Sequence, residues 1–204
     1  MTLSNQPSLS AVIQVPENAD PKIERAAQEL SLYLEKIFQT PFPIGDQAEK
    51  RTIVLGTAAE YPQFAAKLPD KKPGDSEAYL IQSEPDAIYL IGASPLGVQN
   101  ACWAFLYHLG YRHYFPNKKW EIIPTLASFD FTLNEVSRPS YATRGIGIGG
   151  NPWPEHVEEY NDWMRHNLLD SGFELNTWHS YALITQRNEA EFEKHPEYLT
   201  LPPG

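Results

Sequence analysis

Cysteine is almost absent from this 204-residue chain, which excludes the small domains that are held together by covalent or metal cross-links. The single cysteine, Cys102, can form neither a disulfide framework nor a cysteine-rich zinc site within one chain. It falls on the apolar face of a predicted helix. We therefore interpret Cys102 as a small core residue rather than a reactive thiol.

Basic side chains are also scarce, with 16 lysines and arginines against 26 aspartates and glutamates, for a formal net charge of −10. Phosphate binding needs clustered basic residues, so we expect no nucleic-acid partner and no membrane surface. No apolar run approaches the roughly 20 residues of a membrane helix. The polar first ten residues lack the apolar region of a signal peptide, so we expect either a cytoplasmic protein or one whose targeting segment is missing from this sequence. The oligomeric state stays open.

The clearest predicted helix follows Ser94 and ends at Gly110. Ser94 is an N-cap residue and Pro95 suits the first helical position. Apolar residues then recur at spacings of three and four, which places one apolar face toward a core. Extended segments flank this helix at 87–91 and 112–115. The pattern is typical of a layered α/β domain.

The preceding and following segments extend this domain over residues 11–135. A second helix begins at Asp20-Pro21 and carries an apolar stripe to Ile37. The predicted strands are 11–15, 51–57, 77–82, 87–91, 112–115, 120–123 and 128–133. The fold class predicted is α/β (α+β), with a mixed β-sheet and two helices packed on one face.

Residues 140–204 show a different order of elements. We predict a strand at 141–148, a helix at 154–169, a strand at 173–184 and a helix at 186–194. This β-α-β-α order is that of the first βα units of an incomplete (β/α) barrel. A closed barrel needs about 250 residues, so we expect the chain to be a truncated piece of a longer protein.

Several stretches of residues 11–133 resemble a known module. They are the helix segment 26–36, the strands Ile53-Val-Leu-Gly-Thr and Ile88-Tyr-Leu-Ile-Gly, and the helix from Gly97 to Arg112. This pattern resembles the N-terminal α/β module of α-glucuronidases and domain 2 of β-hexosaminidases. The continuation, with His179-Ser180 and His195-Pro196-Glu197-Tyr198, resembles a bacterial family known only as a domain of unknown function.

The resemblance implies a glycoside-hydrolase-like protein that acts on complex carbohydrate and is periplasmic or secreted. In such enzymes the N-terminal module is an accessory domain without catalytic acids. The catalytic carboxylates would then lie on later barrel strands, beyond residue 204. The alternative hypothesis is a non-catalytic carbohydrate-binding or interaction module.

Sugar binding combines aromatic platforms with polar side chains, and five residues near the ends of the predicted barrel strands have these types. The substrate-binding candidates are Arg144, Asn151, Trp153, His179 and Tyr181. The ends of barrel strands are where barrel active sites form. The alternative is that these aromatic side chains fill the barrel core or the interface between modules, an alternative that we favour for Trp178.

We assign no catalytic residue, because glycoside hydrolysis needs two carboxyl groups across the bond. Glu155, Glu158, Glu159 and Asp162 are interpreted as a solvated helix face. Glu174 and Glu197 lie near strands or loops but have no obvious partner acid.

We also expect no metal and no cofactor. His108 and His113 straddle a helix end, and His156 and His166 share a helix that we expect to be exposed, so no metal-binding spacing occurs. The glycines of residues 145–150 match the letters of the dinucleotide-binding fingerprint. However, Asn-Pro-Trp-Pro follows them where a helix should begin.

Overall fold

The computed structural model describes residues 11–46, 51–69, 72, 74–130, 132–141, 143–146, 156–169 and 181–199. The chain divides into two compact units, Met1–Phe173 and Glu174–Gly204, and each is described by itself.

The first unit contains a mixed five-stranded sheet in the order β1-β2-β4-β3-β7. Its strands are β1 (Ala11–Gln14), β2 (Arg51–Thr57), β3 (Tyr79–Ser83), β4 (Ala87–Gly92) and β7 (Asn134–Ser137). β1, β2 and β4 run parallel, while β3 is antiparallel to both β4 and β7. In the β2–β4 register, Val54 lies opposite Tyr89. The short turn between β3 and β4 makes the predicted hairpin.

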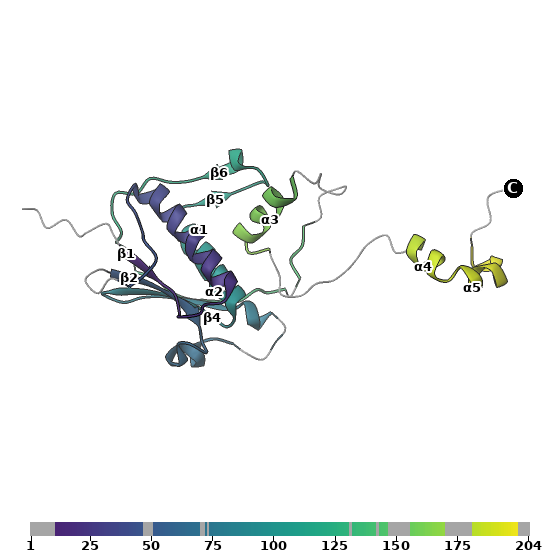
Figure 1. Ribbon diagram of the computed structural model, residues 1–204, viewed down its shortest axis with the longest axis horizontal. Coiled ribbons are helices and arrows are strands. Elements are labelled where there is room, and N and C mark those ends of the chain that lie inside the picture. Colours follow the sequence, from purple (N-terminus) through teal and green to yellow (C-terminus); the bar gives the residue numbers. More distant parts are fainter. Residues whose placement is uncertain are drawn as a thin grey trace, which may run out of the picture. The chain divides into compact units, whose positions relative to one another are not determined.

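Two helices, α1 (Pro21–Phe38) and α2 (Pro95–His108), lie side by side over one face of this sheet (Figure 1). The Asp20 carboxylate caps α1 by accepting a hydrogen bond from the Lys22 amide at 2.8 Å. The Ser94 hydroxyl caps α2 at the Gly97 amide, at 3.4 Å. Both caps are those that the sequence predicts.

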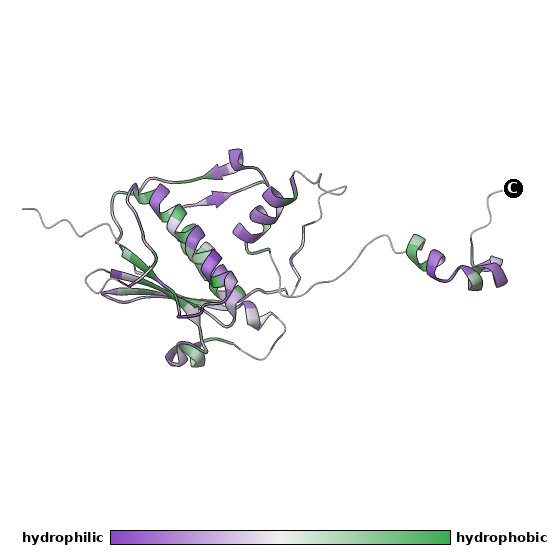
Figure 2. Cartoon of the chain, viewed as in Figure 1, coloured by the Kyte–Doolittle hydropathy of each residue, from purple (hydrophilic) through white to green (hydrophobic). Residues whose placement is uncertain are grey.

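Hydrophobic and hydrophilic residues alternate along α1, as Figure 2 shows, because only one of its faces meets the core. α2 is buried over most of its length, against α1 and the sheet. Cys102 lies in this core and is buried. Burial in apolar surroundings raises the pKa of its thiol, which agrees with a structural role.

Side chains of β3 and β4 alternate between the two faces of the sheet. Ile81 and Leu90 belong to the large core under the helices, whereas Leu80 and Ile91 pack on the opposite face with Phe64. Phe64 comes from a short 3₁₀ segment, Pro62–Lys67. The predicted mixed sheet with its two helices on one face is confirmed.

The last strand of the sheet begins later than predicted. Residues 128–130, 132 and 133 form no strand, and β7 starts at Asn134. Phe129 instead turns into the core against Phe38 and Phe42, at ring-centroid distances of 5.2 and 5.5 Å. This burial takes the segment away from the edge of the sheet. Its apolar residues therefore pack into the core and do not form a strand of the sheet.

A small antiparallel pair, β5 (Arg112–His113) and β6 (Glu121–Ile122), forms within the two segments predicted as strands. Helix α3 (Val157–His166) packs on the same unit, since Arg165 pairs with Glu29 of α1 at 2.7 Å. In the part of the chain that the structure describes, no helix is long and apolar enough to cross a membrane.

Beyond residue 140 the described residues contain helices and no strand. Residues 141 and 143–146 of the predicted strand 141–148 are not extended into a sheet. The second unit holds α4 (Tyr181–Arg187) and α5 (Glu189–Lys194), so the predicted strand 173–184 is wrong for residues 181–184; 173–180 lie outside the described residues. A short apolar run such as Tyr181–Ile184 has no period that separates strand from helix. The barrel, and the module boundary near 135–140, stay predictions.

Candidate functional site

The five predicted sugar-binding residues are not brought together by the described part of the structure. Asn151, Trp153 and His179 lie outside the described residues. Tyr181 belongs to the second unit and is 62% exposed. Arg144 belongs to the first unit, where it lines a pocket.

This pocket has a volume of about 230 Å³ and lies where the start of β3, the end of β7 and the end of α3 meet. Its walls combine polar and apolar side chains. The lining residues are Glu77, Tyr79, Asn100, Ser137, Arg138, Pro139, Arg144, Asn167, Leu168 and Leu169.

Arg144 forms one wall of the pocket through a two-pronged ion pair with the buried Glu77. Its two terminal nitrogens reach the two carboxylate oxygens of Glu77, one of them at 3.3 Å. It also donates to the carbonyls of Leu168, at 3.0 Å, and Tyr141, at 2.9 Å. These bonds engage four of the five N–H donors of the guanidinium. Arg144 therefore holds the chain around the pocket in place and keeps little donor capacity for a ligand.

A second ion pair and a buried phenol complete the polar wall. Arg138 lies 2.9 Å from the buried carboxylate of Asp75. The Tyr79 hydroxyl donates to Glu135 at 2.9 Å. Burial, together with this carboxylate, raises the pKa of Tyr79 to about 12, so the phenol remains a hydrogen-bond donor at neutral pH.

Asn100 is the pocket residue with spare bonding capacity. Its amide nitrogen donates to the Glu77 carbonyl at 3.2 Å. Its buried side-chain oxygen has no hydrogen-bond partner. An acceptor left like this costs about 1–3 kcal/mol. Periodicity assigns Asn100 only to a helix, so the sequence carried no signal for this role.

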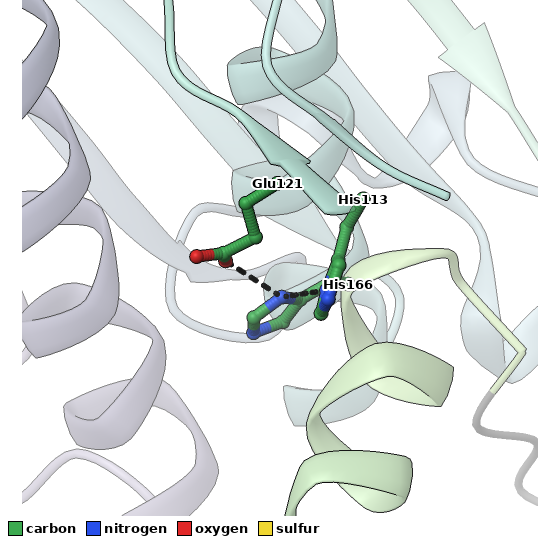
Figure 3. A group of neighbouring side chains, drawn as sticks. All are labelled: His113, Glu121 and His166. Atoms are coloured by element: carbon green, nitrogen blue, oxygen red, sulfur yellow. Dashed lines mark hydrogen bonds and ion pairs between the residues drawn. The ribbon is translucent and has the colours of Figure 1, made fainter. Parts of the chain in front are cut away.

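A second cluster lies where β5, β6 and α3 meet. It contains His113, Glu121 and His166, whose ligand atoms all lie within 4.8 Å of one another. Figure 3 shows the three side chains pointing toward one another from these separate elements. The two Nδ1 atoms are 3.0 Å apart, and Nδ1 of His166 is 3.9 Å from a Glu121 oxygen.

Hydrogen-bond accounting sets the positions of the protons in this cluster. The hydroxyls of Tyr33 and Tyr111 donate to the same Glu121 oxygen, at 2.5 and 2.7 Å. The Tyr111 oxygen must then accept from Nδ1–H of His166, at 2.9 Å. His113 donates through Nε2 to the Asn117 carbonyl at 3.3 Å, which leaves its Nδ1 as an acceptor. One proton of His166 thus serves two acceptors.

The prediction that His166 lies on an exposed helix is wrong, because its side chain is 5% exposed. It stacks on Trp103 of α2, with the ring centroids 3.7 Å apart. Burial, helped by the nearby Arg165, lowers the pKa of His166 to about 2, so the imidazole is neutral. The same burial raises the pKa values of Tyr33 and Tyr111.

The helix that carries His166 also corrects the interpretation of its acids. Asp162 is half-buried and pairs with Arg165 at 2.6 Å and with Arg25 at 3.3 Å. Glu158 is exposed, as predicted. The apolar stripe of α3 predicts that its apolar residues alone attach the helix to the core. In the structure, an ion-pair network and a histidine also attach it.

No protein-family model matches the chain, and no curated protein matches it. Its fold is similar to part of a solved family GH115 4-O-methyl-α-glucuronidase with specificity for decorated arabinogalactans. The identity is 15% and the TM-score 0.57, over 77% of this chain and 24% of that one.

Two further solved structures are similar at TM-scores below 0.5. CpGH84D has 13% identity and a TM-score of 0.42, over 93% of this chain and 39% of that one. A GH138 enzyme targeting pectin rhamnogalacturonan II has 16% identity and a TM-score of 0.36, over 50% and 13%. The chain therefore spans less than half of the length of each of these proteins. What it shares with the α-glucuronidase is the fold of one part of that protein.

Proposed function

We propose that this chain is a non-catalytic α/β module of a glycoside-hydrolase-like protein that acts on complex carbohydrate. The observation that carries the proposal is the fold shared with one part, about a quarter, of the α-glucuronidase. The carboxylates that cleave the glycosidic bond would lie outside these 204 residues.

The carboxylates of the pocket support a non-catalytic role. Hydrolysis needs two carboxyl groups about 5–9.5 Å apart, one of which gives a proton to the leaving oxygen. Glu77 and Asp75 are instead engaged by Arg144 and Arg138. Either acid would have to leave its ion pair before it reached a substrate. Such ion pairs stabilise the chain around the pocket, and their carboxylates are not placed to act as a general acid.

The pocket itself supports the carbohydrate part of the proposal. Its volume of about 230 Å³ is below the usual range of about 300–1,000 Å³ for drug-sized ligands, so it suits a single sugar ring at most. Asn100 lines this space, and its side-chain oxygen has no hydrogen-bond partner but is fully buried, so a sugar hydroxyl would reach it only after a local side-chain shift. Arg144 borders this space. Asn151, Trp153, His179 and Tyr181 remain proposed sugar contacts.

The test is a fluorescence titration of the whole chain with oligosaccharides that contain uronic acids or N-acetylhexosamines, with released sugar measured in the same samples. We expect saturable binding without released sugar. Trp153→Ala and Tyr181→Ala should weaken the binding. Tyr114→Ala, which removes another exposed tyrosine, is the matched control and should not.

Each outcome decides between defined alternatives. Sugar released by the purified chain would overturn the non-catalytic assignment. A lack of binding to every saccharide would overturn the carbohydrate-contact residues and leave a scaffold role. A carbohydrate-binding module outside any enzyme is the second candidate. Saccharide binding favours this second candidate only if the coding sequence after residue 204 contains no barrel strands that carry a pair of catalytic carboxylates.

A further inference from the structure

We propose that His113, Glu121 and His166 form a Zn²⁺-binding site that links β5, β6 and α3. This site is separate from the pocket beside Arg144 and goes beyond the proposed carbohydrate function. The ligands would be Nδ1 of each histidine and a carboxylate oxygen of Glu121, with water as the fourth ligand.

The distances fit a small tetrahedral site. Zinc bonds of about 2.0–2.1 Å place neighbouring ligand atoms roughly 3.3 Å apart. The two Nδ1 atoms are 3.0 Å apart, and the His166–Glu121 separation is 3.9 Å. These values lie on either side of the ideal edge. The third separation, between His113 and Glu121, is within 4.8 Å, so the Glu121 carboxylate would have to move toward both histidines, by up to about 1.5 Å, to reach tetrahedral spacing.

A small cavity adjoins the cluster and has room for the fourth ligand. Its volume is about 30 Å³, close to the share of one water molecule. His113, Glu121 and His166 all line it. Three protein ligands with one open position are the arrangement of zinc sites that keep a bound water.

The outer contacts of the ligands are those that orient metal-binding side chains. His113 donates its Nε2–H to the Asn117 carbonyl, which directs the Nδ1 lone pair into the cluster. Tyr33 and Tyr111 hold the Glu121 carboxylate from the same side. On binding, Zn²⁺ would take the place of the Nδ1 proton of His166. That proton would pass through solvent to Nε2, so that the neutral imidazole binds the ion as its other tautomer.

The ligand set selects the class of metal. Two imidazoles and one carboxylate suit zinc and other borderline transition metals, whereas Ca²⁺ and Mg²⁺ take oxygen ligands. β5 and β6 contain two residues each, so a bound ion would join two marginal strands to α3. The site's effect on the fold would be that of a clamp.

The experiment uses the untagged, chelator-treated chain and ZnCl₂ as the only added ligand. Calorimetric titration should give one Zn²⁺ per chain, and Zn²⁺ should raise the melting temperature because it binds the folded state. Co²⁺ in place of Zn²⁺ should give the intense visible absorption of a tetrahedral site. His113→Gln and Glu121→Gln should each weaken binding by about tenfold or more.

Two exposed histidines serve as matched controls because each lies near a carboxylate. His195 lies 2.9 Å from Glu197, and His156 lies 3.8 Å from Glu159. His156→Ala and His195→Ala should leave the affinity unchanged. The proposal is overturned if the wild-type chain shows no stoichiometric binding. It is equally overturned if the affinity falls with the control variants and not with the cluster variants. Circular dichroism of each variant separates loss of binding from loss of folding.

Discussion

Replacing Gly97 by alanine tests how closely α2 packs on the sheet. In an exposed helix this change would add about 0.8–1.0 kcal/mol of stability, because alanine is the better helix former. In α2 an added Cβ would lie 2.4 Å from the Ala78 carbonyl oxygen and 3.1 Å from the Gly92 Cα. Both atoms belong to the backbone, so neither can rotate away.

The contact with Ala78 also determines the size of the effect. Its carbonyl accepts a hydrogen bond from the Ala93 amide at 2.9 Å, at the step from β4 into α2. Overpacking costs about 1–3 kcal/mol, and weakening this bond about 1 kcal/mol more. Less the gain in helix propensity, we expect Gly97→Ala to lower the free energy of unfolding by about 2 kcal/mol.

Urea denaturation followed by circular dichroism measures this change. For a slope of about 2 kcal/mol per molar, the midpoint should fall by about 1 M urea. Gly145→Ala is the control, since an added Cβ there meets nothing within 4 Å. A Gly97→Ala midpoint equal to or above that of the wild type would refute the close contact between helix and sheet.

Three further predictions concern charged and titratable groups. Arg165→Met should raise the hydrogen-exchange rate of the α3 amides, because it removes the ion pair with Glu29. Replacement of the exposed Arg25 should change the free energy of unfolding by no more than about 0.5 kcal/mol. In metal-free protein, the free energy of unfolding should fall as the pH drops below about 6.5, because the unfolded chain protonates His166 and the folded chain does not until about pH 2. Urea midpoints at several pH values measure this slope, which His166→Gln should flatten; an unchanged slope would count against the buried neutral imidazole. Conversely, the raised pKa of Tyr79 stabilises the fold below pH 10, and this contribution should be lost as the pH rises toward about 12. The difference between the ultraviolet pH titrations of the wild type and of Tyr79→Phe isolates the Tyr79 phenol. In the folded protein this difference should appear at a higher pH than in the unfolded protein.

The sequence by itself determined the two central helices and most of the sheet. The caps at Asp20 and Ser94 and the apolar stripes are local features, and local chemistry decides where a helix starts and which face it buries. The turn after Ser83 likewise specified the β3–β4 hairpin. These elements form from neighbouring residues, so a linear pattern contains the information.

The predicted strand at 128–133 failed because a tertiary contact outweighed a local pattern. Phe129 is apolar enough for a strand, yet its ring completes the core beside Phe38, and this displaces the strand to β7. Tyr181–Ile184 reads equally well as strand or helix, and the structure makes it α4. A short apolar run has no period that separates strand from helix, and it does not show against what the segment packs.

Both candidate sites were decided by the tertiary structure alone. Arg144 meets Glu77 across 67 positions, and His113 meets His166 across 53. Spacing along one helix or strand predicts a site only when its residues share that element. Here the ligands of the proposed zinc site come from two short strands and a helix, each of which is unremarkable by itself. Their chemistry arises because the burial of α3 against α2 turns His166 inward, toward groups that no local pattern connects to it.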